Sequence, residues 1–291
     1  MAGASGRTLD IANELRNGWS TSRMTSTTQS RSTTVKTWGD RVTLRFEIEG
    51  AGPPLVFLHA AGGLVWDGFL RDLAQRYTVY APVFPGFDPS DTMAIHELDD
   101  VSDVVLAYEQ ALRSLKITGA PIIGHSFGGM LAAELAAHFP QICSQLVLLA
   151  PSGLWTEAMP WSLNFMTARP DQMLGYLFND PEGEAARSLL PVLDTPERAL
   201  EAVVQSIWAL GCVAKFSWPV PDRGLSRRLH RVAASTLVIW GHQDSLIPHG
   251  YAKEFARRIP NCRSETIGNC GHMPQVERED VTSGLVAGFL A

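Results

Sequence analysis

The 291-residue sequence predicts an α/β protein with a doubly wound, mostly parallel β-sheet and a helical cap inserted into it. Short apolar runs bounded by glycine, proline and polar residues are the first indication, because they suit strands buried on both faces of a parallel sheet. The runs are 55–60, 78–84, 120–125, 145–150 and 236–241. Helical patterns that alternate with these runs are the second indication, at 98–116, 127–138, 249–258 and 275–289.

The third indication is a long interruption of this alternation between residues 152 and 232. The segment contains helical stretches separated by prolines and no convincing strand. A run of this length is too long for a plain loop in a compact domain. We therefore expect residues 152–232 to form a helical cap, and residues 34–151 and 233–291 to form the α/β core.

The N-terminal part of the chain has a different character. Residues 1–33 are rich in serine, threonine and arginine and poor in apolar residues, which is typical of a flexible extension. This stretch lacks the apolar central region of a secretory signal. From residue 34 onward, apolar and polar positions alternate around a Gly39-Asp40 turn, which predicts a β-hairpin.

The composition is that of an ordinary globular protein, with 45% hydrophobic and 19% charged residues. A formal net charge of −6 argues against nucleic acid or an anionic membrane as the main partner. No continuous apolar run approaches the roughly 20 residues that a membrane-spanning helix needs. We therefore expect no membrane span.

The four cysteines, Cys143, Cys212, Cys262 and Cys270, have neither the spacing of a metal site nor a CxxC motif. We expect reduced thiols and a cytoplasmic protein, although a disulfide between Cys262 and Cys270 remains an alternative. The sequence also contains no recognisable metal site or phosphate-binding loop. It therefore predicts a protein that needs no metal and no cofactor.

The sequence Gly124-His125-Ser126-Phe127-Gly128 stands between a predicted strand and a predicted helix. This is the Gly-x-Ser-x-Gly pattern of a nucleophile elbow, and the strand before it and the helix after it make the match specific. The glycines allow the close backbone approach of a strained turn. The alternative is a serine that merely fills a glycine-rich turn or caps the helix.

A serine hydroxyl needs a base to take its proton and an acid to orient that base. His272 lies in a glycine-rich turn after a short predicted strand, where a base can reach Ser126, and His242 is the main alternative. Asp244 lies in the loop after the preceding strand and is the candidate acid. Its alternative role is to cap the helix that begins near Pro248.

The site also needs amides that stabilise a developing oxyanion. In such sites one amide belongs to the residue after the nucleophile, here Phe127, and another to a turn after the first central strand. The stretch "FLHAAGGLVWDGF" supplies that turn. We expect His59, within it, to brace the turn by hydrogen bonds rather than to take part in catalysis.

With these pieces in place, residues 34–291 resemble the α/β-hydrolase fold family, in its capped serine esterase or lactonase branch. The resemblance rests on "LHAAGG", "VFPGF", "GHSFGG", "WGHQDSLIP" and "GNCGHMPQVE", which occur in the family's order. It implies Ser126 as nucleophile, His272 as base and Asp244 as orienting acid. It also implies that the oxyanion amides belong to Phe127 and Ala61.

One departure concerns the oxyanion turn. The family usually has His-Gly where this chain has His59-Ala60. Alanine tolerates a positive φ less well than glycine, so the turn can differ locally. Ala60 therefore remains a rival to Ala61 as the amide donor.

The resemblance also narrows the reaction. A serine at position 126 differs from the aspartate that haloalkane dehalogenases and epoxide hydrolases use, and Met273 differs from the lysine of the hydroxynitrile lyases. Hydrolases that cleave carbon–carbon bonds of ring-fission diketones typically have asparagine in place of His125 and tryptophan in place of Met273. We therefore expect hydrolysis of a carboxylic ester or lactone. Carbon–carbon hydrolysis and a non-catalytic ligand-binding role remain alternatives.

The predicted cap is rich in aromatic residues. Those expected to contact substrate are Trp155, Trp161, Phe165, Trp208 and Trp218. Such a lining favours a small or medium apolar substrate. The alternative is that these side chains form the cap's own small core.

Overall fold

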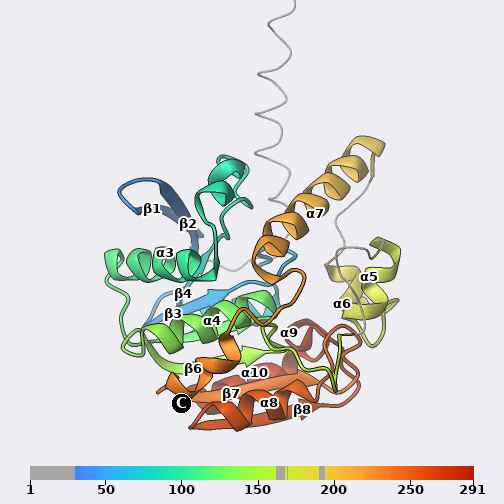
Figure 1. Cartoon of the computed structure of the whole chain (residues 1–291). Helices are drawn as coiled ribbons and strands as arrows, with labels where there is room; N and C mark the ends of the chain where they lie inside the picture. Colours follow the sequence, from blue (N-terminus) through green and yellow to red (C-terminus); the bar gives the residue numbers. More distant parts are fainter. Residues whose placement is uncertain (1–29, 162–167, 169, 190–193) are drawn as a thin grey trace, which may run out of the picture.

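The computed structural model describes residues 30–161, 168, 170–189 and 194–291, and its centre is an eight-stranded sheet (Figure 1). The strand order is β1-β2-β4-β3-β5-β6-β7-β8. The strands are β1 (Arg31–Thr37), β2 (Val42–Glu49), β3 (Pro54–Leu58), β4 (Thr78–Pro82), β5 (Ala120–His125), β6 (Cys143–Leu149), β7 (Ser235–Gly241) and β8 (Cys262–Ile267). β2 pairs antiparallel with β1 and β4, and the five remaining pairs are parallel. The predicted fold class is confirmed.

The start of the sheet corrects one predicted boundary. β1 begins at Arg31, which pairs with Ile48 of β2, so residues 31–33 belong to the hairpin and not to the extension. Most of β1 is exposed at the edge of the sheet. A strand in that position needs few apolar residues, which is why its polar composition resembled that of an extension.

Nine α helices and three 3-10 helices are described. The α helices are α2 (Gly68–Ala74), α3 (Val101–Ser114), α4 (Phe127–His138), α5 (Pro170–Leu177), α6 (Glu184–Ser188), α7 (Pro196–Ser217), α8 (Tyr251–Arg258), α9 (Pro274–Glu277) and α10 (Glu279–Leu290). The 3-10 helices are η1 (Thr92–Glu97), η2 (Leu225–Arg227) and η3 (Leu229–Arg231). The helix predicted over 275–289 is two helices, α9 and α10, which meet at Arg278.

The segment 152–232 contains α5, α6, α7, η2 and η3 and no strand among its described residues. Several polar contacts join it to the rest of the protein, among them those of Arg228 and Tyr251. The Arg228 guanidinium donates two hydrogen bonds, of 2.7 and 2.6 Å, to the buried Glu134 carboxylate of α4. The Tyr251 hydroxyl of α8 donates to the Met159 carbonyl at 2.6 Å and accepts from the Thr156 N–H at 3.0 Å.

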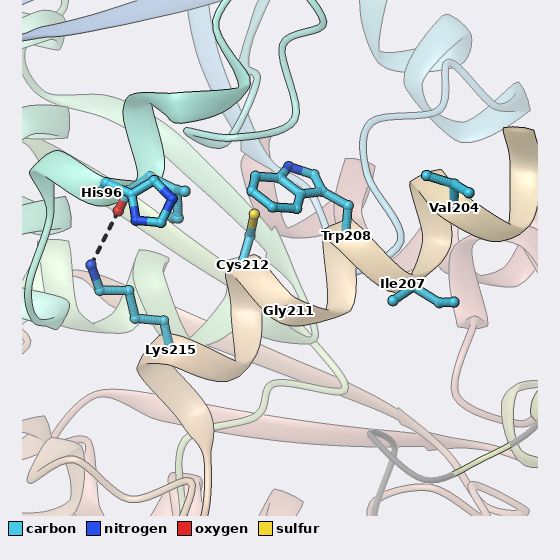
Figure 2. Close-up of a pocket in the computed structure, with 8 residues that line it drawn as sticks. His96, Val204, Ile207, Trp208, Gly211, Cys212 and Lys215 are labelled. Atoms are coloured by element: carbon cyan, nitrogen blue, oxygen red, sulfur yellow. Dashed lines mark hydrogen bonds between the residues drawn. The ribbon is translucent and has the colours of Figure 1, made fainter.

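α7 is the longest described helix, and it extends outward from the core (Figure 1). Together with η1 it lines an open groove of about 480 Å³ (Figure 2). The groove is lined by Ile95 and His96 of η1 and by Val204, Ile207, Trp208 and Cys212 of α7, among others. Beside it, the Trp208 indole N–H donates to the Gly86 carbonyl at 2.8 Å, which holds α7 against the loop that follows β4.

α7 also meets, by length and composition alone, the criterion for a membrane span. Its most apolar 18-residue window has a mean hydropathy of 1.3, and 22% of that window is buried. The sequence analysis expected no such segment because it looked for a continuous apolar run. In α7 the apolar residues are interrupted by Gln205 and Ser206.

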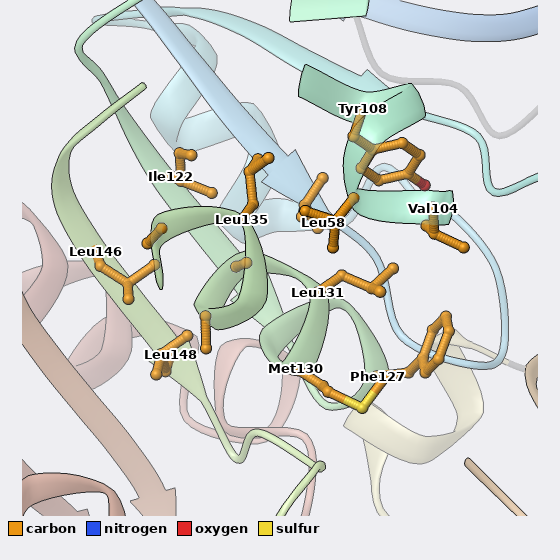
Figure 3. Close-up of a cluster of buried hydrophobic side chains, with 14 of the residues drawn as sticks. Leu58, Val104, Tyr108, Ile122, Phe127, Met130, Leu131, Leu135, Leu146 and Leu148 are labelled. Atoms are coloured by element: carbon orange, nitrogen blue, oxygen red, sulfur yellow. The ribbon is translucent and has the colours of Figure 1, made fainter. Parts of the chain in front are cut away.

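Two hydrophobic cores fill the two faces of the sheet. On one face α4 lies across the parallel strands, and Phe127, Met130, Leu131 and Leu135 pack with Leu58 of β3 and with residues of β5 and β6 (Figure 3). On the other face α2 and α10 cover the sheet. This arrangement places the N-terminus of α4 at the carboxyl ends of the strands, where binding sites of such sheets lie.

Candidate active site

Ser126 occupies a strained turn between β5 and α4. Its φ of 52° and ψ of −115° lie in a region that residues other than glycine rarely adopt. The neighbouring glycines have no space for a side chain. A Cβ added at Gly124 would lie 2.4 Å from the Gly128 carbonyl oxygen, and one added at Gly128 would lie 2.1 Å from the Leu58 carbonyl oxygen. The turn therefore requires both glycines that the motif contains.

The structure brings the three predicted polar side chains into one hydrogen-bonded chain. His272 Nε2 lies 2.8 Å from Ser126 Oγ, and His272 Nδ1 lies 2.7 Å from Asp244 Oδ2. All three side chains are buried and come from the loops after β5, β7 and β8. Because a carboxylate only accepts, Nδ1 carries the proton, and Nε2 accepts from the serine hydroxyl. This is the arrangement in which a histidine can take the serine proton.

Asp244 receives hydrogen bonds on both carboxylate oxygens. Oδ1 accepts from the backbone N–H groups of Leu246 and Ile247, each at 2.9 Å. Oδ2 accepts from the Trp240 indole N–H at 2.8 Å as well as from His272. The carboxylate thus closes the local turn and orients the imidazole at the same time.

Trp240 is a site residue that the sequence analysis missed. It lies fully buried near the end of β7. Its indole N–H also reaches the Ile247 carbonyl at 3.1 Å. The available signal was a tryptophan in an otherwise aliphatic buried strand, since a buried indole usually needs a hydrogen-bond acceptor.

The loop that carries His272 is held by its neighbours. The His272 N–H donates to the Leu177 carbonyl of α5 at 2.7 Å. The Gly271 N–H donates to the Glu277 carboxylate of α9 at 2.6 Å. A Cβ at Gly271 would lie 2.6 Å from the Leu177 oxygen, so the loop approaches α5 more closely than a side chain would allow.

His125 supports the same loop from the side of β5. Its Nε2–H donates to the His272 carbonyl at 2.9 Å, and its Nδ1 accepts from the Gln275 side-chain amide at 3.2 Å. Burial, and secondarily the neighbouring His272, lowers the pKa of His125 to about 3. The ring is therefore neutral at physiological pH and acts as a structural link. The sequence analysis missed Gln275, whose partner lies 150 residues away.

His59 braces the turn after β3, as predicted from its position. The Phe84 N–H donates to Nε2 at 3.0 Å, which leaves Nδ1–H to donate to the Ala60 carbonyl at 2.7 Å. Burial lowers the pKa of His59 to about 4, so this ring is also neutral. The left-handed residue of the turn is Gly63, with φ of 99°, and Ala60 has no positive φ. Alanine at position 60 therefore causes no backbone strain.

The two predicted oxyanion donors are the backbone amides of Phe127 and Ala61. Phe127 is the first residue of α4, where an N–H has no partner within the helix. In the part of the chain that the structure describes, neither amide has a hydrogen-bond acceptor. Both remain available to a ligand, and the positive end of the α4 dipole favours an anionic one.

The predicted substrate-contacting aromatics lie in different environments. Trp161 packs against the core that contains Phe127, and its buried indole N–H has no hydrogen-bond partner among the described residues. Trp208 lines the groove beside η1. The Trp155 indole N–H donates to a Glu157 carboxylate oxygen at 3.4 Å, and Trp218, at the end of α7, is 44% exposed. Phe165 lies outside the described residues.

All four cysteines are free thiols. Within the described ranges, no three side chains of histidine, cysteine, aspartate or glutamate form a group that could hold a metal ion.

Comparison with known proteins shows the family. The family model described as alpha/beta hydrolase fold matches residues 53–279, so the chain belongs to the α/β-hydrolase fold family.

Relatives within this family differ in their reactions. The chain is 25% identical to a 2-hydroxy-6-oxo-6-phenylhexa-2,4-dienoate hydrolase of Burkholderia cepacia, over 92% of this chain and 99% of the relative. It is also 25% identical to a pimeloyl-[acyl-carrier protein] methyl ester esterase of Nitrosomonas europaea, over 79% of this chain and 93% of the relative. The solved structure of naproxen esterase from Bacillus subtilis superimposes with a TM-score of 0.71 at 18% identity, covering 98% of this chain and 97% of the other, which shows a shared fold.

Proposed function

We propose that this protein is a serine hydrolase that cleaves a carboxylic ester or lactone of a small to medium apolar substrate through an acyl-enzyme. The observation that supports it most directly is the hydrogen-bonded chain from Ser126 through His272 to Asp244. A serine without a hydrogen-bonded base is a poor nucleophile. The 2.8 Å contact between Ser126 and His272 also weighs against a non-catalytic role.

In the proposed reaction, Ser126 Oγ attacks the substrate carbonyl carbon while His272 Nε2 takes its proton. The Asp244 carboxylate stabilises the imidazolium, and the Phe127 and Ala61 amides stabilise the oxyanion. His272 then protonates the leaving alcohol. In the second half, the same ring removes a proton from water, which attacks the acyl-enzyme; His272 then returns this proton to Ser126 Oγ as the acyl–oxygen bond breaks and the acid is released.

Carbon–carbon hydrolysis is the second candidate, and the similarity to the Burkholderia dienoate hydrolase favours it. Two positions favour ester hydrolysis over carbon–carbon hydrolysis. His125 and Met273 stand where that branch typically has asparagine and tryptophan, and the His125 ring is already bonded to the His272 carbonyl and Gln275. The Nitrosomonas methyl ester esterase shows that relatives at the same identity include esterases.

Two steady-state assays separate these candidates. The chain should hydrolyse a short-chain aryl ester with a kcat/KM at least about a hundredfold above that for a 2-hydroxy-6-oxo-dienoate. The reverse ratio would establish the carbon–carbon reaction and reject the ester proposal. Absence of both activities, together with no labelling of Ser126, would reject a serine hydrolase altogether.

The nucleophile is tested by Ser126→Ala. This variant should lose at least about a thousandfold in kcat and all labelling by a fluorophosphonate, while its circular dichroism stays unchanged. Ser152→Ala is the matched control, since Ser152 is a buried neighbour whose N–H donates to the Ser126 carbonyl and whose hydroxyl has no partner. The control should still be labelled. Labelling that persists in Ser126→Ala would place the nucleophile elsewhere.

The finer features of this function are proposals as well. The division into a core (31–151 and 233–291) and a helical cap (152–232) is supported by the helices found in residues 152–232. The aromatic side chains of the cap, Trp161 in particular, are proposed to contact the apolar part of the substrate. We also propose that the protein needs no cofactor. A cytoplasmic location is proposed as well, and the four free thiols support it.

A further inference from the structure

α7 exposes a continuous apolar face. Five large side chains between residues 200 and 208 are 38–66% exposed: Leu200, Val203, Val204, Ile207 and Trp208. At 3.6 residues per turn they fall within an arc of about 140°. Val213 and Phe216, which are buried against the core, lie on the opposite side of the helix. We call the five exposed side chains the α7 face.

The α7 face is separate from the surface by which α7 packs on the core. A surface helix usually has one apolar stripe, and that stripe covers the core. α7 has a second one, which borders the groove beside η1 (Figure 2). In the described part of the chain these side chains remain partly exposed to solvent, and exposed apolar patches mark interaction sites.

Charge indicates what kind of surface the α7 face fits. Residues 202–214 contain no aspartate, glutamate, lysine or arginine, and the charged residues of α7 lie only near its two ends. The whole chain carries a formal net charge of −6. A partner that depends on electrostatic attraction, such as an anionic membrane, has little to bind here. An uncharged apolar phase fits this face better.

The small area of the α7 face argues against a second copy of this chain as its partner. The α7 face extends over nine residues, from Leu200 to Trp208, so it is about 14 Å long and about 10 Å wide and offers roughly 140 Å². A stable protein interface buries about 800 Å² on each partner. The face is large enough, in contrast, for a helix that lies in the plane of a lipid surface with one apolar side immersed. Trp208 at its edge suits such an interface, because an indole has an apolar body and a polar N–H.

We propose that the α7 face binds the surface of a zwitterionic lipid bilayer, with α7 lying in the plane of the interface rather than crossing it. The anchoring of its other side by Val213 and Phe216 keeps the helix attached to the globular body. The binding does not depend on catalysis by Ser126. It would place the groove between α7 and η1 next to the acyl chains.

Flotation with phosphatidylcholine vesicles tests this binding on the full chain. The unmodified protein should float with the vesicles. Ile207→Glu and Leu200→Glu should each lower the partition coefficient at least about tenfold, because each puts a charge into the apolar phase. Leu106→Glu is the matched control, since Leu106 is 45% exposed on α3, and it should float normally. Ser126→Ala should float like the unmodified protein.

Further measurements separate this proposal from its rivals. Binding should not weaken between 0.1 and 1 M salt and should not require phosphatidylserine. Ile207→Glu should hydrolyse a water-soluble aryl ester at the normal rate. Failure of the full chain to float, equal flotation of the α7 variants, or a strict need for anionic lipid would overturn the proposal. A dimer in gel filtration that Ile207→Glu dissociates, without vesicle binding, would assign the face to a second copy instead.

Discussion

At the scale of single residues, the candidate site depends on Asp244, which only accepts hydrogen bonds, and on Trp240, which only donates them. Asp244 is held by two backbone amides and the Trp240 indole before it contacts His272. Its carboxylate therefore cannot rotate without losing several bonds. This fixes the direction in which the His272 ring points and the tautomer that it adopts.

Trp240→Phe tests this support. The change removes the indole donor to Asp244 and keeps an aromatic ring. We expect a free energy of unfolding about 1–3 kcal/mol lower and a kcat about tenfold to a hundredfold lower, with a smaller change in KM. Urea unfolding and steady-state kinetics measure these effects.

Trp161→Phe is the stability control, because the Trp161 N–H has no hydrogen-bond partner and its loss should cost little. If Trp240→Phe leaves kcat unchanged, then the indole does not orient Asp244.

Sequence patterns predicted Ser126, His272 and Asp244 as partners because each lies in a local motif with a characteristic neighbourhood, and the structure places the three side chains in one hydrogen-bonded chain. The same reasoning missed Trp240 and Gln275, whose hydrogen-bond partners are reached only through the fold. The oxyanion turn was predicted only in part. The sequence located it, but the structure showed that Gly63 rather than position 60 takes the left-handed conformation.

At the scale of the element, the N-terminus of α2 carries a capping carboxylate whose negative charge lowers the stability of the folded protein. Asp67 caps α2 by accepting the Leu70 N–H at 2.9 Å, and the Glu279 carboxylate of α10 lies close by. Burial, reinforced by Glu279, raises the pKa of Asp67 to about 7, although the Leu70 N–H and Arg71 act in the opposite direction. The negative charge of Asp67 is therefore unfavourable in the folded protein.

The sign of the resulting pH dependence follows from this shift. An aspartate in an unfolded chain has a pKa of about 4, so folding favours the protonated form of Asp67. The stability that this group contributes is lost as the pH rises from about 4 through 7. Since Asp67 keeps some contact with solvent, which screens its charge, we expect a loss of about 1 kcal/mol.

Asp67→Asn should abolish this loss, because asparagine caps a helix about as well and carries no charge. The free energy of unfolding of the variant minus that of the unmodified protein should therefore be larger at pH 8 than at pH 5. Urea unfolding of both proteins at both pH values measures this difference. Glu279→Gln, which removes the facing charge, should give a smaller change in the same direction. A difference between variant and parent that is identical at both pH values would contradict the assigned cause.

Element by element, the sequence predicted long periodic segments better than short ones. The parallel strands and α3, α4 and α8 were expected near their observed positions. α2 was not predicted, because its seven residues are too few to establish a periodic pattern. The polar strand β1 was partly assigned to the extension, because an exposed edge strand lacks the alternation that a half-buried one shows.

At the scale of the whole molecule, the contacts between the segment 152–232 and the core determine how the site is enclosed. Tyr251 is central to them, because its hydroxyl bonds both Thr156 and Met159. Its ring is buried in the main core. One side chain of α8 therefore holds the beginning of that segment in place.

Tyr251→Phe removes these two bonds and keeps the ring. We expect the free energy of unfolding to fall by about 1–2 kcal/mol and limited proteolysis after residue 152 to accelerate several-fold. Tyr108→Phe serves as the control, since Tyr108 is buried in the same core and the structure describes no hydrogen bond of its hydroxyl. Equal protease sensitivity of the two variants would show that the Tyr251 hydroxyl does not hold the segment.

The sequence by itself determined the class of fold, the order of the parallel strands along the chain and the three residues of the proposed triad. These depend on local periodicity and on short motifs, which act within a few residues. Only the tertiary structure decided how Ser126 and His272, 146 residues apart, come within 2.8 Å, and that Trp240, Gln275 and Glu277 hold the surrounding loops. It also decided that one side of α7 stays uncovered, because which faces of a helix are buried depends on packing between distant segments.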